Sequence, residues 1–246
     1  MAFKDHFSHL AADYHQFRPR YPPELGAWLA GAAPGPGVAL DLATGNGQAA
    51  VALAGHFARV IASDASASQL AHARPHPRVS YLRHPAECLP VRSGSIDVVA
   101  VAQAAHWFDL ERFYPEARRV LKPSGLVALW TYDTFRIDDP VDRLVDAFYS
   151  GVVGRYWPPE RRHVEQGYRT LPFPFAELPA PAFVLATEWT LAQLVGYLST
   201  WSAVDRYRAA TGADPLPRLT ADLASVWPQD APRRVHWPLH LRIGRV

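Results

Sequence analysis

A buried strand followed by a tight glycine loop constrains this chain more than any other feature. The apolar run over 38–42 predicts a short strand, and a helix is expected to begin at about Gln48. Between them, Gly45 and Gly47 allow a sharp turn in which no Cβ blocks the approach of a ligand. The helix start adds unpaired N–H groups and the positive end of the helix dipole. The pattern therefore predicts a nucleotide-like ligand at the carboxyl end of this strand.

Strand and helix patterns alternate from this point to about residue 132. Further strands are expected at 59–63, 79–83, 96–101 and 126–132, and helices at 48–57, 66–73 and 110–121. Alternation of this kind, with helical crossovers between the strands, implies an α/β fold whose parallel sheet is covered on both faces.

The last hundred residues follow a different pattern. A helix is expected at 141–150, and the stretch 155–181, rich in Pro and aromatic residues, predicts an irregular cap. A strand at 183–189 and a helix at 191–209 follow, and residues 235–243 alternate between apolar and polar as a strand does. No internal repeat divides the chain, so a single domain is expected.

Composition narrows the class of partner. The 246 residues carry 25 Lys and Arg against 23 Asp and Glu, and the basic residues are scattered, so no nucleic acid or membrane partner is expected. The single cysteine excludes an intrachain disulfide, and no metal signature accompanies the histidines, so no metal is expected. The polar N-terminus and the absence of a membrane-length apolar run predict a cytoplasmic protein. Oligomeric state is left open.

The spacing of the glycine loop allows more than one function. The segment Gly45-Asn-Gly47-Gln-Ala-Ala50 fits the dinucleotide fingerprint, and Asp64 follows about 20 residues later at the end of the second strand. A strand-end carboxylate can accept hydrogen bonds from a ribose diol, so an NAD(P)-dependent oxidoreductase is possible by spacing alone. Lys122 is the only lysine beyond the N-terminal segment, which leaves few candidates for a catalytic Tyr/Lys pair. A non-catalytic cofactor-binding protein on the same fold is the third possibility.

Asp41 favours a different cofactor. An acidic residue in the last turn of the strand would oppose a pyrophosphate but suits a cofactor that carries an ammonium group. The pattern hydrophobic-Asp41-x-x-x-Gly45-x-Gly47, followed by Asp64, resembles motif I and the ribose-binding acid of class I S-adenosylmethionine-dependent methyltransferases.

Segments further along resemble one branch of that family, the methyltransferase type 11 proteins that include trans-aconitate methyltransferase-like members. The resemblance rests on Ala86-Glu-Cys-Leu-Pro90, Gly94-Ser-Ile-Asp97, Gln103-Ala-Ala-His-Trp-Phe108 and a preamble from Phe7 to Pro22. It covers about residues 1–135. Two departures stand out, because Ala43 replaces the usual first glycine of motif I and His84-Pro85 replaces an acidic residue.

The resemblance implies a fold and its subdivision. We expect a Rossmann-like, seven-stranded, mostly parallel sheet with helices on both faces, an antiparallel last strand, and N-terminal and mid-chain caps. Residues 1–246 would form one domain. Its expected parts are an N-terminal helical cap (1–32), a cofactor-binding core (33–135), a cap and substrate region (136–182), and C-terminal strands and a helix that complete the sheet (183–246).

The resemblance also implies S-adenosylmethionine as cofactor and a set of residues around it. Asp41 would hold the methionyl part, Asp64 the ribose hydroxyls, and Gln103 would lie under the sulfonium. Tyr14 and Arg18 would close over the methionyl carboxylate, to which a guanidinium can bind bidentately. The cofactor-binding residues expected are Tyr14, Arg18, Asp41, Ala43, Thr44, Gly45, Gly47, Asp64, Ala65, Ala86, Glu87 and Gln103.

His106 and Trp107 would face the substrate, with Trp130 and Tyr132 as further substrate contacts. The expected reaction is methylation of a small molecule, at a carboxylate or hydroxyl oxygen. A carboxylate nucleophile needs no general base, whereas a neutral hydroxyl does. His106 is the best candidate for that base by position and ordinary pKa, although it could equally form only a hydrogen bond to the substrate.

Overall fold

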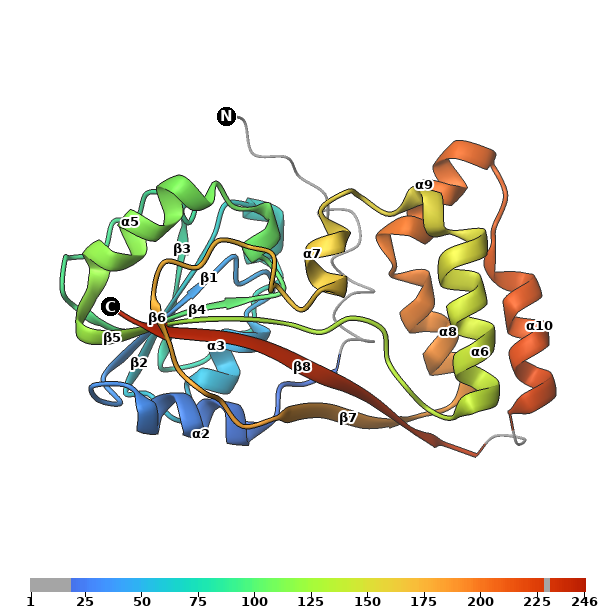
Figure 1. Ribbon diagram of the computed structural model, residues 1–246, viewed down its shortest axis with the longest axis horizontal. Helices are drawn as coiled ribbons and strands as arrows, with labels where there is room; N and C mark the ends of the chain where they lie inside the picture. Colours follow the sequence, from blue (N-terminus) through green and yellow to red (C-terminus); the bar gives the residue numbers. More distant parts are fainter. Residues whose placement is uncertain (1–18, 228–230) are drawn as a thin grey trace.

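A sheet-based core and a bundle of helices are joined by two long strands in the computed structural model (Figure 1). The structure describes residues 19–227 and 231–246, and every structural statement below refers to these ranges. Tyr14 and Arg18, both expected at the cofactor, lie outside the described residues.

Five parallel strands form the core of the sheet. They are β1 (Val38–Leu42), β2 (Arg59–Asp64), β3 (Val79–Arg83), β4 (Ile96–Ala102) and β5 (Leu121–Thr131). The long β8 (Arg233–Arg245) pairs antiparallel with β5, as expected for the last strand. With the two-residue β6 (Ala176–Glu177) and with β7 (Phe183–Trp189), the order is β3-β2-β1-β4-β5-β8-β6, and β7 also pairs with β8. The sheet thus has eight strands where seven were expected.

Helices cover both faces of the sheet, as the strand–helix alternation predicts. One face carries α2 (Pro23–Ala32) and α3 (Gln48–Leu53), and the opposite face carries α5 (Leu110–Val120) (Figure 1). Successive residues of β4 point to opposite sides, since Val98 belongs to the core under α2 and α3 and Val99 to the core under α5. This two-sided burial explains why β4 is apolar without interruption from Val98 to Ala102. The short α4 (Ala67–Ala71) follows β2.

The remaining helices gather at the far end of β8 (Figure 1). These helices, which we call the helical part, are α6 (Asp139–Ala147), α8 (Leu191–Ser199), α9 (Ser202–Thr211) and α10 (Leu216–Val226). α10 contacts both α6 and α8. The π-helical turn η2 (Phe148–Val152), the 3-10 turn η3 (Gly154–Tyr156) and α7 (Arg161–Glu165) lead back towards the sheet.

The helix expected over 191–209 is two helices, and they pack in the helical part rather than on the parallel sheet. The break lies at Thr200 and Trp201, and the extended backbone of Trp201 (φ −71°, ψ 129°) directly precedes α9. Its buried indole packs against the rings of Tyr149 and Trp157, with centroids 5.6 and 5.5 Å away. Burial of this ring in an aromatic cluster therefore outweighs continuation of the helix.

β8 has two partners along its length. Its first half pairs with β7, from Arg233 to Leu239, and its second half pairs with β5, from His240 to Arg245. Pro238, which lacks an N–H, lies opposite Val184 of β7 and outside the ladder to β5. The missing N–H of Pro238 therefore removes no hydrogen bond from the ladder to β5.

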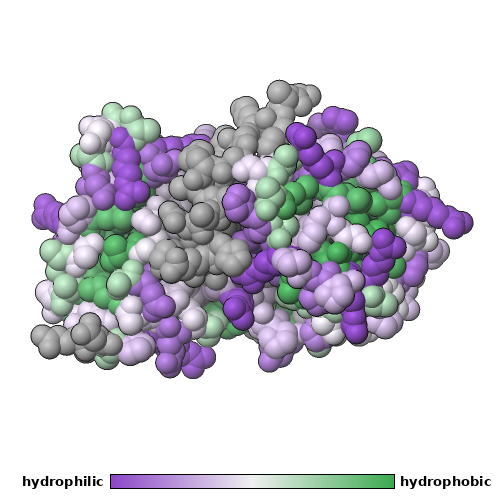
Figure 2. All heavy atoms as spheres, turned by 180° about the vertical axis from the view of Figure 1, so that it is seen from behind, coloured by the Kyte–Doolittle hydropathy of each residue, from purple (hydrophilic) through white to green (hydrophobic). Residues whose placement is uncertain are grey.

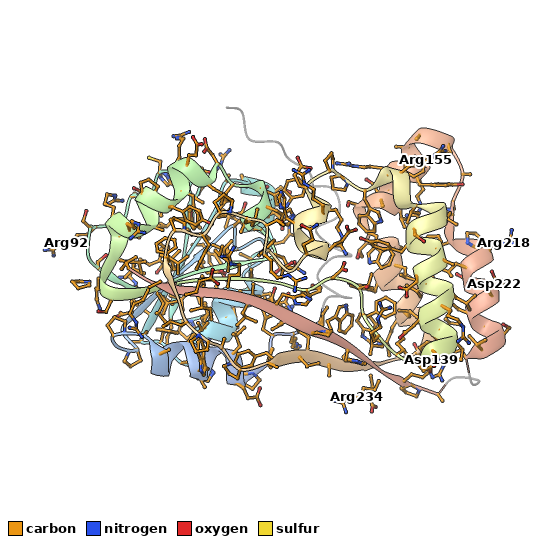
Figure 3. The ribbon with its side chains drawn as sticks, in the orientation of Figure 1. Arg92, Asp139, Arg155, Arg218, Asp222 and Arg234 are labelled. Carbon is orange, nitrogen blue, oxygen red and sulfur yellow. The ribbon has the colours of Figure 1, made fainter. Side chains whose placement is uncertain are left out.

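The outer surface mixes polar and apolar residues (Figure 2). Within the described chain, the exposed large hydrophobic residues are Val152 and Val184, at 42% and 44% exposure. Charged side chains of both signs point outward around the periphery, among them Arg92, Arg155 and Arg218 (Figure 3). None of the helices in the described ranges is both long and apolar enough to cross a membrane.

Candidate functional site

The strand order reverses at the carboxyl ends of β1 and β4. The chain runs outward from β1 to β2 and β3 on one side and from β4 to β5 on the other, so the order reverses between β1 and β4. Ligands of open α/β sheets bind at such a reversal. The glycine loop follows β1 and Gln103 follows β4, so both lie at this edge.

Asp41 is a fully buried carboxyl group in β1. Its Oδ2 accepts a hydrogen bond of 2.5 Å from the Thr44 hydroxyl, while its Oδ1 has no hydrogen-bond partner among the described residues. Burial raises the pKa of Asp41 to about 7, and the Thr44 hydroxyl and the nearby Ala50 amide offset only part of that rise. A buried oxygen without a partner costs free energy, so this position is suited to a ligand that brings a donor or a positive charge.

The loop after β1 has a left-handed backbone at three positions. Gly45 and Gly47 have φ of 55° and 82°, and Ala43 has φ of 51°. Ala43 thus keeps a conformation that suits the glycine usual in the family, at a cost of about 1–2 kcal/mol. A Cβ at Gly47 would lie 2.1 Å from the Tyr81 hydroxyl, so this position admits only glycine without movement of Tyr81.

Asp64, at the end of β2, is tied to the same loop. Its Oδ2 accepts from the Gly45 N–H and its Oδ1 from the Ser66 N–H, both at 2.8 Å. The two bonds fix the orientation of the carboxylate and hold the end of β2 against the glycine loop.

Gln103 links the ends of β4 and β5. Its backbone is left-handed, with φ of 58°, and its Nε2 donates to the Tyr132 carbonyl at 2.9 Å. The Thr131 hydroxyl donates to its Oε1. The side chain is therefore held at the carboxyl edge beside the β1 loop, where the sequence places it.

Three further residues that were expected to bind the cofactor lie on the neighbouring loops. Ala65, half-buried, directly follows Asp64, and Ala86 is buried. Glu87 is half-buried, and its Oε1 accepts from the Asp109 N–H at 3.1 Å, just before α5. One oxygen of Glu87 thus has a structural partner.

His106 lies in the 3-10 turn η1 (Ala105–Trp107) after β4. Its Nδ1 is 2.8 Å from the Tyr168 hydroxyl, and its ring stacks on Trp107 with centroids 4.6 Å apart. Burial is the main cause that lowers the pKa of His106 to about 3, with smaller contributions from Arg161 and His163. The imidazole is therefore neutral at physiological pH and weakly basic.

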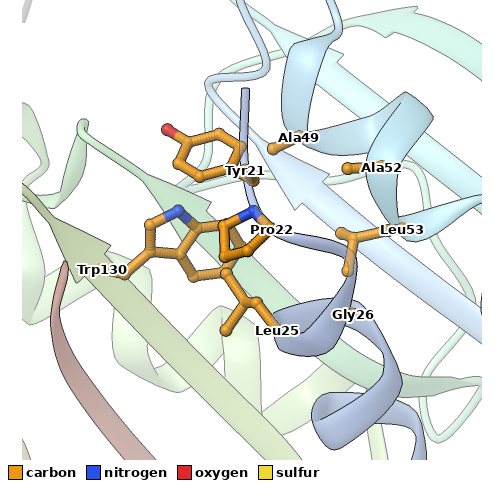
Figure 4. Close-up of a pocket in the computed structure, with 8 residues that line it drawn as sticks. All are labelled: Tyr21, Pro22, Leu25, Gly26, Ala49, Ala52, Leu53 and Trp130. Carbon is orange, nitrogen blue, oxygen red and sulfur yellow. The ribbon is translucent and has the colours of Figure 1, made fainter. Parts of the chain in front are cut away.

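The structure does not bring Trp130 to an open surface. It is 1% exposed and packs edge-on against Tyr21 at 5.6 Å. A cavity beside it, of about 10 Å³, holds at most about one water molecule. Its lining is drawn in Figure 4: Tyr21, Pro22, Leu25, Gly26, Ala49, Ala52, Leu53 and Trp130. Tyr132 is also buried and lies edge-on to Trp237, so both residues act mainly as core.

One cluster near His106 was not expected as a unit. Arg161 of α7 forms an ion pair with Asp133, which lies two residues beyond β5, and its Nε donates to the Tyr149 hydroxyl at 2.9 Å. Its guanidinium also lies over Trp157, 4.7 Å from the ring centroid. Arg161 is thus already paired within the protein. No sequence spacing signals a pair 28 residues apart.

Comparison with known proteins agrees with this geometry. A model of the methyltransferase-domain family matches residues 40–129. A protein of Dictyostelium discoideum described as a methyltransferase is 31% identical over 229 residues, spanning 92% of this chain and 87% of the relative. This chain belongs to the class I S-adenosylmethionine-dependent methyltransferases.

Further relatives of the methyltransferase support the assignment. A solved structure described as a type II methyltransferase from Anaeromyxobacter dehalogenans is 49% identical, covers 93% of this chain and 98% of that chain, and superposes with a TM-score of 0.89. An uncharacterized methyltransferase of Mycobacterium tuberculosis is 33% identical, over 81% of this chain and 74% of the relative. Family membership selects the methyltransferase interpretation over the oxidoreductase one, and the expected Rossmann-like fold is confirmed.

Proposed function

We propose that this methyltransferase uses S-adenosylmethionine to methylate an oxygen of a small molecule, either a carboxylate or an acidic hydroxyl. The observation that carries the proposal is the buried Asp41 carboxyl, with one oxygen unpartnered in the described chain, next to a left-handed loop at the strand reversal. S-adenosylmethionine, when bound, supplies an electrophilic methyl group that an acceptor oxygen displaces in line.

The residues present fit this cofactor. The unpartnered Oδ1 of Asp41 offers a charge partner to an ammonium group, and the left-handed loop brings backbone close to a ligand without side chains in between. The oriented carboxylate of Asp64 can accept from two ribose hydroxyls. The remaining expected contacts would be Tyr14, Arg18, Ala43, Thr44, Ala65, Ala86, Glu87 and Gln103.

The neutral, buried state of His106 supports an anionic acceptor. A base with a pKa of about 3 gains little by accepting a proton at neutral pH, so it gives little help to a neutral alcohol or amine. An acceptor that is already anionic needs no base. The protein then contributes alignment and exclusion of water, which are large effects in bimolecular transfer. His106 and Trp107 would contact this acceptor.

Two measurements test the proposal. Thermal unfolding with S-adenosylhomocysteine should show a clear rise in Tm, whereas NADH should show none. Turnover with S-adenosylmethionine should then occur on a panel of small carboxylic acids and acidic phenols, and not on matched amines or alcohols. Stabilisation by NADH alone would contradict the cofactor, and turnover only on amines would contradict the acceptor. Binding without turnover on any acceptor would favour a non-catalytic protein.

A further inference from the structure

Tyr168 is a buried residue that the proposed reaction has not used. It follows α7, is fully buried, and its hydroxyl lies 2.8 Å from Nδ1 of His106. The two residues are 62 positions apart in the chain. No other hydrogen bond of normal geometry is made by this hydroxyl within the described residues.

The backbone around Tyr168 holds the ring in an unusual conformation. Gly167 and Tyr168 are both left-handed, with φ of 57° and 63°, and such a backbone costs a non-glycine residue about 1–3 kcal/mol. A Cβ at Gly167 would lie 2.8 Å from His240. From β8, Arg242 Nη1 donates to the Tyr168 carbonyl at 3.2 Å and to the Leu171 carbonyl at 2.6 Å. The fold thus sustains strain that keeps the hydroxyl at His106.

The number of protons on each side chain decides whether Tyr168 or His106 is the donor in this hydrogen bond. Burial raises the pKa of Tyr168, so the phenol keeps its proton, and a neutral imidazole carries one proton on either nitrogen. The Thr131 hydroxyl and the backbone amides of Ala105 and His106 lie near the phenolic oxygen, and the two amides can only donate. The Thr131 hydroxyl gives its own proton to Gln103. The phenol proton therefore has Nδ1 as its well-placed acceptor.

We propose that Tyr168 donates to Nδ1 and fixes His106 as the Nε2–H tautomer, so that the ring presents a hydrogen-bond donor, not a base, to the acceptor substrate. Nε2 forms no hydrogen bond within the described residues, which leaves it for a ligand. An Nε2–H group can bind a carboxylate or phenolate oxygen but cannot take a proton from an alcohol or amine. Tyr168 is thus a positioning residue, and His106 the group that touches substrate; this second step rests on the proposed function.

The test is the tautomer of His106 in the free protein, measured by long-range proton–nitrogen correlation NMR at neutral pH. His106→Gln assigns the signals. We expect one set of ring-nitrogen signals, with Nε2 protonated and Nδ1 not. In Tyr168→Phe, the bond to Nδ1 is lost, and signals of both tautomers should appear. Because neither cofactor nor acceptor is present, the outcome does not depend on whether the proposed reaction is right.

A matched control comes from Tyr114, whose hydroxyl donates to the Pro172 carbonyl at 2.5 Å. Tyr114→Phe also removes one buried phenol bond but should leave the His106 signals unchanged. Protonated Nδ1 in the unsubstituted protein would overturn the proposal and would mean that Tyr168 donates to Thr131 instead. This measurement on the unsubstituted protein tests the proposal even if the Tyr168→Phe variant fails to fold. If the Tyr168→Phe variant folds and its His106 ring-nitrogen signals are unchanged, the proposal is also overturned.

With an anionic acceptor from the panel, the same variant separates positioning from folding. Loss of an oriented donor weakens a hydrogen bond worth about 1 kcal/mol, so the KM for the acceptor should rise about fivefold, with a smaller change in kcat. If the panel yields no acceptor, the proposed function fails while the tautomer result still stands. A fall in kcat with an unchanged KM would contradict the donor role of His106.

Discussion

At the scale of single residues, the proposed contact of Asp41 with the cofactor predicts that cofactor affinity depends on pH. Burial is the main cause that raises its pKa to about 7, so near neutral pH much of the free protein carries a neutral Asp41. An ammonium group is attracted only by the ionised form. The affinity for S-adenosylhomocysteine, which carries that group, should therefore rise about tenfold between pH 6 and pH 8. Calorimetric titrations with S-adenosylhomocysteine between pH 6 and pH 8 measure this change in affinity.

The same shift has the opposite sign for folding stability. The folded state holds the Asp41 proton more tightly than the unfolded chain, so this stabilisation is present at acidic pH and is lost as pH rises through about 7. Asp41→Asn should abolish both pH dependences and weaken binding at pH 8. Asp146→Asn, at an exposed ion pair with Arg136, serves as the control. An affinity that is flat with pH in the unsubstituted protein would contradict the assignment of Asp41.

Alanine substitutions at Gly47 and Gly94 distinguish the cost of a left-handed backbone from the cost of a steric clash. Gly47→Ala introduces a Cβ 2.1 Å from the Tyr81 hydroxyl at a left-handed position, whereas Gly94→Ala, also left-handed, meets open space. Gly94→Ala should lower the free energy of unfolding by about 1 kcal/mol, and Gly47→Ala by clearly more. Chemical denaturation of both variants gives the comparison. Adding Tyr81→Phe should recover part of the extra loss; equal losses at the two glycines would show that Tyr81 gives way freely.

At the scale of elements, the Asp133–Arg161 pair fastens α7 to the end of β5. Both side chains are about three-quarters or more buried, so removal of one charge leaves the other poorly solvated. Arg161→Ala should lower the free energy of unfolding by about 3 kcal/mol. The same change in an Asp133→Asn background should cost less, because no carboxylate is left unpaired. Equal losses in both backgrounds would assign the effect to packing on Trp157 instead.

At the scale of the whole molecule, the local sequence pattern was sufficient to predict some helices and strands but not others. β3 and β7 have the predicted bounds, because each is a short alternating or apolar run between turns. α10 was not expected, since Pro215 and Pro217 at its start resemble a loop. The prediction of a single helix over 191–209 was wrong, because the burial of Trp201 divides this segment into two helices. Contacts such as Tyr168 with His106 depend on packing across the chain and have no local signal.

One hydrophobic core spans the sheet and the helical part. It includes Val98 and Ala100 of β4, Trp237 of β8, Leu194 of α8 and Leu219 of α10. Because β8 runs through both regions and buries Trp237 completely between them, neither region can lose its packing while the other keeps it. The two should therefore unfold in a single cooperative transition, although their helices come from separate stretches of chain.

This cooperativity is tested by comparing the unfolding transitions that two independent spectroscopic probes report. Far-UV circular dichroism and tryptophan fluorescence should give the same denaturation midpoint. Trp237→Phe, which leaves a cavity at the junction, should move both midpoints together, by an amount equivalent to about 1–3 kcal/mol. Two separated transitions would show that β8 connects units that are stable independently. In that case the helical part could move relative to the sheet, and the position of Arg161 beside His106 would depend on that motion.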